Sequence, residues 1–275
     1  MKAIPVPTQA PAKEGVAHLP GGAQLFYWDT GGDGPAVIFS HPATGSALVW
    51  AYQQPAFTAA GYRTIGYSRR GHYGSAPVET GRGGGASTDL HELVEYLGVD
   101  KFHAVASAAG GAIIVDYAHS HPERLYSLTL SSSVGGVRDK EYLALSESLR
   151  PRGFEDMPPD FREIGPSYRA INPAGVREWL ALEHKALTGE RLGQTPVNHI
   201  TWKSLETMRV PTLLMTGDAD LWLPPSVLRL FAARLPVNEM LIVPEVGHAI
   251  YWEAPEIFNR AVLDFIGRHG KITAP

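Results

Sequence analysis

The side chains best suited to catalysis lie in three short segments, in the chain order turn, acid, histidine. The first segment, residues 105–111, reads Val-Ala-Ser-Ala-Ala-Gly-Gly and stands between an apolar run and a helical pattern. The second contains Asp218 and Asp220, and the third ends in Gly247 and His248. A histidine oriented by a carboxylate can take a proton from a nucleophile and return it to a leaving group. The sequence therefore indicates acid–base chemistry that would serve a nucleophile on the turn.

The turn has the composition of a nucleophile elbow but no nucleophile at its centre. Such a turn joins a strand sharply to a helix, and small residues two positions before and after the reactive side chain allow the bend. If the turn is centred on Ala108, Ala106 and Gly110 occupy those two positions. If it is centred on Ser107, Val105 occupies one of them and fits poorly. We therefore expect Ala108 at the nucleophile position. Ser107 would pack under the turn or form a local hydrogen bond. The alternative is that Ser107 serves as a substitute nucleophile.

Composition and charge exclude several classes of function. The 275 residues include no cysteine, so a disulfide scaffold, a thiolate metal site and a cysteine nucleophile are excluded. The net charge of -4 gives no electrostatic reason to expect a nucleic acid or a membrane surface as partner. No apolar run approaches the roughly 18 residues of a membrane span, and the histidines lack metal-ligand spacing. We expect a cytoplasmic monomer or homodimer that acts on a small molecule, without metal or cofactor, since residues 1–13 show no apolar signal-peptide core.

Apolar runs and helical patterns alternate along most of the chain. Short apolar runs predict strands at 24–28, 36–40, 62–67, 102–105, 125–130, 211–215 and 240–243. Helical patterns lie between them, including one after Ser87 and Thr88, which can cap it, and a final one at about 255–268. Strands are absent from residues 135–208, where helical patterns occur at 140–149 and 175–187. The expected fold is α/β, a mostly parallel sheet of about eight strands with helices on both faces. Its core would comprise residues 1–134 and 209–275, and residues 135–208 would form an inserted helical cap, or lid.

Four motifs occur in the order and strand context of one known superfamily. They are the loop 40–45, the Gly-containing turn 67–75, the elbow, and the acid and histidine segments 217–225 and 246–248. Over roughly residues 20–270 the chain resembles the α/β-hydrolase superfamily, and in particular its serine esterases and lactonases. Nucleophile, acid and histidine follow one another in that order in this family. The resemblance implies the α/β-hydrolase fold, with the helical cap between the sixth and seventh strands.

The resemblance also implies a role for individual residues. Ala108 would hold the nucleophile position of a catalytic triad, where a serine is expected, and His248 would be the general base. Asp220 would orient the histidine, with Asp218 as a competing acid, because the spacing from Gly217 favours Asp220.

An oxyanion hole needs two backbone N–H groups directed at the developing negative charge. Ala109 would supply one of them, and Ala43 would supply the other because Pro42 has no N–H. Bulky apolar side chains suggest a roomy, partly aromatic substrate pocket. Its expected lining residues are His41, Ser107, Phe154, Tyr168, Trp179, Trp222 and Tyr251.

The alanine at position 108 decides how a function can be stated. Removal of the serine from a comparable triad lowers turnover about a million-fold. We therefore expect the chain to bind substrate without turning it over. The complete set of acid, histidine and oxyanion elements favours a serine deliberately replaced to trap a complex, and a natural alanine is the other explanation.

Three functions are compatible with this pattern. The first is hydrolysis of carboxylic esters or lactones of medium size, with the present chain an inactivated form. The second is hydrolysis of a carbon–carbon bond in a ring-cleavage diketone. The third is a natural, non-catalytic ligand-binding protein.

Overall fold

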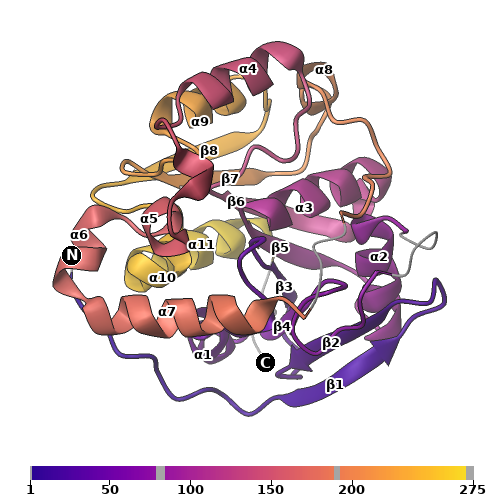
Figure 1. The fold of residues 1–275 in the computed structure, drawn as a ribbon. Coiled ribbons are helices and arrows are strands. Elements are labelled where there is room, and N and C mark those ends of the chain that lie inside the picture. Colours follow the sequence, from indigo (N-terminus) through magenta and orange to yellow (C-terminus); the bar gives the residue numbers. More distant parts are fainter. Residues whose placement is uncertain (1, 79–83, 189–192, 271–275) are drawn as a thin grey trace.

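The computed structural model describes residues 2–78, 84–188 and 193–270, and these contain one eight-stranded sheet with the strand order β1-β2-β4-β3-β5-β6-β7-β8 (Figure 1). The strands are β1 (Lys13–His18), β2 (Gln24–Asp29), β3 (Ala36–Ser40), β4 (Arg63–Tyr67), β5 (Phe102–Ser107), β6 (Leu125–Ser131), β7 (Thr212–Gly217) and β8 (Asn238–Val243). The pairs β1–β2 and β2–β4 are antiparallel, and all other neighbours are parallel. The expectation of about eight mostly parallel strands is confirmed.

Helices cover both faces of this sheet, as expected. They are α1 (Gln53–Ala59), α2 (Ala86–Tyr96), α3 (Ala109–Ser120), α9 (Pro225–Ala232), α10 (Ile250–Glu253) and α11 (Pro255–His269). Neighbouring residues of a strand point to opposite faces, so Ile38 joins one buried cluster while Val37 and Phe39 join the other. The Ile38 cluster lies under α2, α3 and α9, and the Phe39 cluster lies under α1, α10 and α11. Strands buried on both faces explain the continuous apolar runs in the sequence.

Five α-helices lie between β6 and β7 in the residues that the structure describes. They are α4 (Lys140–Ser148), α5 (Pro159–Glu163), α6 (Pro166–Ile171), α7 (Pro173–Ala186) and α8 (Trp202–Leu205), which together we call the helical insertion. Proline begins α5, α6 and α7, where its missing N–H costs nothing. Figure 1 shows two groups: α4 and α8 lie near α9, whereas α5, α6 and α7 lie toward α10 and α1. Within the described ranges no helix is long and apolar enough to cross a membrane.

The predicted cap at the start of α2 differs from the structure. The helix begins at Ala86 after Gly85, and neither Ser87 nor Thr88 caps it with a side chain. The Ser87 hydroxyl instead donates a hydrogen bond to the buried carboxylate of Asp116. The glycines between 81 and 85 also predict a flexible loop before this helix, and that segment lies mostly outside the described residues.

Candidate active site

Ala108 occupies a sharp turn between β5 and α3. Its backbone has φ 47° and ψ -117°, a conformation that residues other than glycine rarely adopt. The turn is fixed at its start by a hydrogen bond from the Ala108 N–H to the Ser131 carbonyl, 2.9 Å long. A side chain at Gly110 would collide with the Ser40 carbonyl, so glycine is required there. The strained turn predicted from the small residues is therefore present, with Ala108 at its centre.

Ser107 is one residue earlier, at the end of β5, and its position argues against a role as substitute nucleophile. The residue is completely buried, and its hydroxyl has no hydrogen-bond partner among the described residues. It does not line the cavity that contains Ala108 and His248. The expectation that it packs under the turn agrees with this burial, but its expected place in the substrate pocket does not, because the strand has not yet emerged from the core.

His248 and Asp220 form a buried, hydrogen-bonded pair. The His248 Nδ1 lies 2.8 Å and 2.9 Å from the two Asp220 carboxylate oxygens. The backbone N–H groups of Trp222 and Leu223 donate to Asp220 at 2.8 Å and 2.9 Å, and the Thr216 hydroxyl donates at 3.1 Å. The carboxylate is therefore held from three sides. Asp218, the competing acid, accepts a hydrogen bond from the Glu245 N–H instead.

The interaction between Asp220 and His248 favours the charged form of each residue: it lowers the pKa of Asp220 and raises the pKa of His248. Burial alone would raise the pKa of Asp220, but the charge of His248 and the hydrogen bonds outweigh burial and lower it. Burial alone would lower the pKa of His248, but the charge of Asp220, reinforced by Glu163, raises it to about 9. The imidazole is accordingly oriented and made more basic by the same carboxylate.

A second buried acid, Glu253, holds the backbone around His248. Its carboxylate accepts hydrogen bonds from the N–H groups of Gly165 at 2.8 Å, Gly247 at 3.0 Å and Ala249 at 3.3 Å. Burial raises the pKa of Glu253 to about 7, and the three N–H groups oppose that shift. A Cβ on Gly165 would lie 2.7 Å from the Gly247 nitrogen, so the two glycine backbones touch. Glu253 was not predicted as a site residue, because its only signal in the sequence is an acid that follows the apolar run 250–252.

The cavity beside the strained turn is small and partly polar. Its volume is about 260 Å³, and its lining includes Ala108, His248, Trp222 and Ser132. Trp222 borders the histidine, with ring centroids 6.1 Å apart, and Phe154 packs edge-on against Trp222. Ser132 has φ 53°, and its buried hydroxyl has no partner among the residues that the structure describes. Trp222, expected in the substrate pocket, thus lines this cavity beside the histidine.

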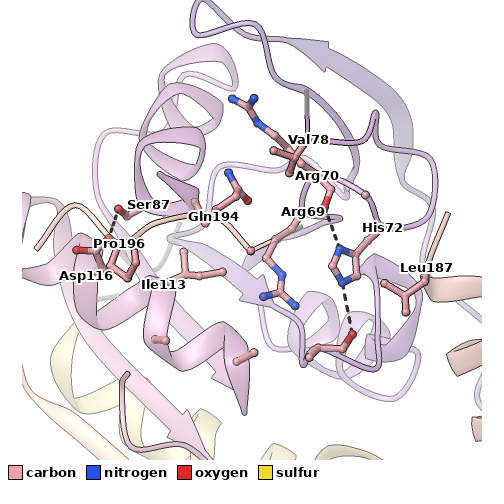
Figure 2. A pocket seen from close by; sticks show the side chains of 16 residues that line it. Arg69, Arg70, His72, Val78, Ser87, Ile113, Asp116, Leu187, Gln194 and Pro196 are labelled. Atoms are coloured by element: carbon pink, nitrogen blue, oxygen red, sulfur yellow. Dashed lines mark hydrogen bonds between the residues drawn. The ribbon is translucent and has the colours of Figure 1, made fainter. Parts of the chain in front are cut away.

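A second cavity, of about 280 Å³, lies on the other side of the turn (Figure 2). Ala43, Ala109, Arg69 and His72 are among its lining residues, and Ala109 and Ala112 line both cavities. Across the described part of the chain, no hydrogen bond takes up the N–H of Ala43 or Ala109. Ala43 and Ala109, the two residues expected to supply the oxyanion-hole N–H groups, therefore both line this cavity, and Ala109 also lines the cavity that contains Ala108 and His248.

Three aromatic residues expected in the substrate pocket lie in the core instead. Tyr168, Trp179 and Tyr251 are almost completely buried and pack α6 and α7 against α10. The Trp179 indole N–H donates to the Tyr251 hydroxyl at 3.3 Å, and the Asn172 amide donates to the Tyr168 hydroxyl at 3.0 Å. They line neither cavity. This corrects the prediction, because their apolar surface is used to anchor the helical insertion.

His41 also departs from its expected place in the substrate pocket. The ring is completely buried, and its Nε2 accepts a hydrogen bond from the Arg69 N–H at 3.0 Å. Burial, followed by the positive charges of Arg69 and His72, holds the pKa of His41 well below its usual range. His41 is thus a neutral residue that shapes the loop before Ala43 and does not line the cavity.

Comparisons with known proteins agree with the resemblance in the sequence. Residues 37–261 match the alpha/beta hydrolase family. A 2-hydroxy-6-oxononadienedioate/2-hydroxy-6-oxononatrienedioate hydrolase of Paraburkholderia phymatum is 28% identical over 290 residues, covering 95% of this chain and 98% of its own.

Solved structures show the same architecture. An esterase of Thermogutta terrifontis has a TM-score of 0.74 at 19% identity, covering 94% of this chain and 100% of its own. An enol-lactonase of Burkholderia xenovorans LB400 has a TM-score of 0.72 at 18% identity, covering 92% of this chain and 99% of its own. At these identities the structural likeness shows a shared fold alone.

Proposed function

Because the chain belongs to the alpha/beta hydrolase family, we propose that its site is that of a serine hydrolase of carboxylic esters or lactones, with Ala108 in place of the nucleophile. The observation that carries this proposal is the buried Asp220–His248 pair beside the strained turn of Ala108. A strained backbone and a shifted pair of titratable groups at one cavity are characteristic of a catalytic site.

Each residue has a defined role in the proposed mechanism. The Nδ1 of His248 is engaged by Asp220, which leaves Nε2 to accept the proton of a serine hydroxyl at position 108 and return it to the leaving alcohol. That serine oxygen would attack the ester carbonyl, and the N–H groups of Ala43 and Ala109 would stabilise the resulting oxyanion. A water molecule activated by His248 would then release the acid.

With Ala108 present, the proposed activity is reduced to binding. The side chain has no atom that can form the covalent intermediate, and loss of a triad serine lowers turnover about a million-fold. The intact surroundings of position 108 support an origin by replacement of serine. The division into a core of residues 1–134 and 209–275 and a cap of residues 135–208, the cytoplasmic location and the small-molecule partner stay predictions.

Hydrolysis of a carbon–carbon bond is the second candidate. It is favoured by the Paraburkholderia phymatum relative, a hydrolase of that kind by the substrate in its name, which spans almost the whole chain. The same serine, histidine and acid would be used, on a diketone in place of an ester. A natural ligand-binding protein is the third candidate, and it is supported by the alanine itself.

The change Ala108→Ser tests the proposal directly. We expect hydrolysis of p-nitrophenyl butyrate to rise by several orders of magnitude, because the histidine and the two N–H donors are already in place. Ala112→Ser is the matched control, since Ala112 lines the cavity that contains Ala108 but lies inside α3. It adds the same hydroxyl away from the turn and should give no rise.

The substrate series separates the three candidates. Hydrolysis of esters or lactones by the Ala108→Ser protein supports the first candidate, and hydrolysis of a vinylogous diketone alone supports the second. If the serine is restored and none of these substrates is cleaved, both hydrolase candidates are refuted and the binding protein is favoured.

A further inference from the structure

Arg69 reaches from the loop after β4 to the loop that carries Ala43. Its guanidinium Nη2 donates a hydrogen bond to the Pro42 carbonyl at 2.9 Å, and its backbone N–H donates to His41. Figure 2 shows the Arg69 side chain extending into the cavity between Ile113 and His72. Arg69 thus binds the two residues that precede Ala43, His41 through its main chain and Pro42 through its side chain.

The Pro42 carbonyl belongs to the same peptide group as the Ala43 N–H. None of the described peptide bonds is cis, and in a trans peptide the C=O and the N–H point in opposite directions. A donor that fixes the Pro42 oxygen therefore also fixes the direction of the Ala43 N–H, which must point away from the guanidinium. The Gly45 N–H donates to the same oxygen at 3.1 Å. The His41 Nδ1 also lies 2.7 Å from it and carries the ring proton, because Nε2 accepts from the Arg69 N–H. The peptide is therefore held by three donors, and Arg69 is the charged one.

We propose that Arg69 is a positioning residue of the oxyanion hole, which orients the Pro42–Ala43 peptide so that the Ala43 N–H meets the substrate oxygen. This inference rests on the proposed function. A charged donor makes a stronger hydrogen bond than a neutral one, and such a bond at the C=O end of a peptide polarises its N–H end. Arg69 would therefore both aim the Ala43 N–H and make it a better donor.

The surroundings of Arg69 suit this role. His41, the ring it contacts, is neutral, and His72 adds a contact between its Nε2 and the Ala43 carbonyl at 3.4 Å. Arg70 points the other way in Figure 2 and is paired with Asp89 at 2.7 Å. The remaining acid at the cavity, Asp116, accepts hydrogen bonds from Ser87, Val197 and Asn198.

The first test measures the peptide itself in the protein as it is. Loss of a hydrogen bond at a carbonyl moves its ¹³C resonance upfield, and the Pro42 carbonyl is read through the Ala43 amide in a triple-resonance spectrum of deuterated protein. We expect an upfield shift in Arg69→Met and a smaller one in Arg69→Lys, which keeps a donor. Arg268→Met, which removes an exposed arginine paired with Glu239, is the matched control and should leave the resonance unchanged. An unchanged resonance in Arg69→Met would overturn the proposal, whatever the protein hydrolyses.

The second test measures the consequence for catalysis in the Ala108→Ser protein. Loss of a direct oxyanion donor costs about 100- to 1,000-fold in kcat, so loss of a residue that aims one should cost about 10- to 100-fold. We expect this loss in Arg69→Met, with KM little changed and with partial recovery in Arg69→Lys. An unchanged kcat, or a loss confined to KM, would overturn the catalytic role.

The two tests keep this proposal separate from the proposed function. If Ala108→Ser hydrolyses none of the substrates, the proposed function and the catalytic role of Arg69 both fail, while the carbonyl resonance still decides whether Arg69 orients the peptide. If Arg69→Met does not fold, Arg69→Lys alone carries both measurements.

Discussion

The two sides of the candidate site are held in place by opposite charges. On the histidine side, the buried carboxylates of Asp220 and Glu253 accept hydrogen bonds from backbone N–H groups. On the oxyanion side, Arg69 donates to a backbone carbonyl, and the ring of His72 lies near the next one. Negative side chains thus bind peptide N–H groups on the histidine side, and a positive side chain binds a peptide carbonyl on the oxyanion side.

This difference follows from what each side must present to a substrate. The histidine side presents a side-chain nitrogen that accepts a proton, and nearby negative charge makes that nitrogen more basic. In the proposed mechanism the oxyanion side would present backbone N–H groups to a developing negative charge, and positive charge behind those peptides would strengthen them as donors. An exchange of charge sign on either side would weaken the site.

The largest expected effect is on the histidine side. In the Ala108→Ser protein, Asp220→Asn should lower kcat about 10,000-fold, because an amide cannot hold the imidazole in the required tautomer. Asp218→Asn is the matched control: Asp218 bonds to the Glu245 N–H and not to His248, so kcat should stay near the parent value. Steady-state kinetics on one aryl ester measures both. Equal losses in the two variants would contradict the assignment of the acid.

The pH dependence of hydrolysis follows from the raised pKa of His248, which lies at about 9. The neutral imidazole is the base, so kcat/KM of the Ala108→Ser protein should rise about tenfold per pH unit below 9 and level off above it. The same shift affects folding. A histidine pKa raised from 6.5 stabilises the fold below pH 6.5, and this contribution is lost as the pH rises through 9. A rate that levels off near pH 6 would show that the buried carboxylates do not act on His248.

Glu253→Gln should destabilise the fold by about 2 kcal/mol. The glutamine NH₂ cannot accept a hydrogen bond, so at least one backbone N–H that Glu253 now binds would lose its acceptor. The variant also removes one of the charges that raise the pKa of His248, so the pH profile should move to lower pH. Urea unfolding measures the first effect. Glu256→Gln, an exposed acid on α11, is the matched control and should change neither quantity. Unfolding free energies that agree for the two variants would exclude Glu253 as the support of the histidine loop.

The smallest expected effect concerns the strained turn. Ala108→Gly should stabilise the fold by about 1 kcal/mol, since glycine adopts positive φ without strain and this gain exceeds its extra entropy in the unfolded chain. Ala112→Gly is the control inside α3, where glycine should destabilise by about 1 kcal/mol. Thermal unfolding compares them. A destabilised Ala108→Gly protein would show that the turn carries no strain.

The sequence predicted the sheet and the acid–histidine pair well because both are local signals. The run Ala36–Ser40 is apolar throughout because both its faces are buried, and Asp220 and His248 are reactive side chains in themselves. Strand β1 was missed because it is mostly exposed and so carries no apolar run. Its position at the edge of the sheet explains that exposure.

The residues that support the site could not be predicted in the same way. Arg69 and Glu253 act through backbone groups far away in the sequence, such as the Pro42 carbonyl and the Gly165 N–H. No residue type or spacing encodes such a partner. The misplaced aromatic residues, such as Trp179, have a related cause, because a bulky apolar side chain suits a pocket and a core equally well.

The contact between Gly165 and Gly247 ties the helical insertion to the loop that carries His248. The His248 N–H donates to the Glu163 carbonyl at 2.8 Å, so displacement of this part of the helical insertion would pull the catalytic loop out of register. The segment 163–165 and the histidine loop should therefore open only together, as one cooperative unit. On the other side of the insertion, Tyr142, Ser146 and Arg150, in and just after α4, contribute to the lining of the cavity. One part of the insertion thus holds the histidine loop, and another part borders the cavity beside it.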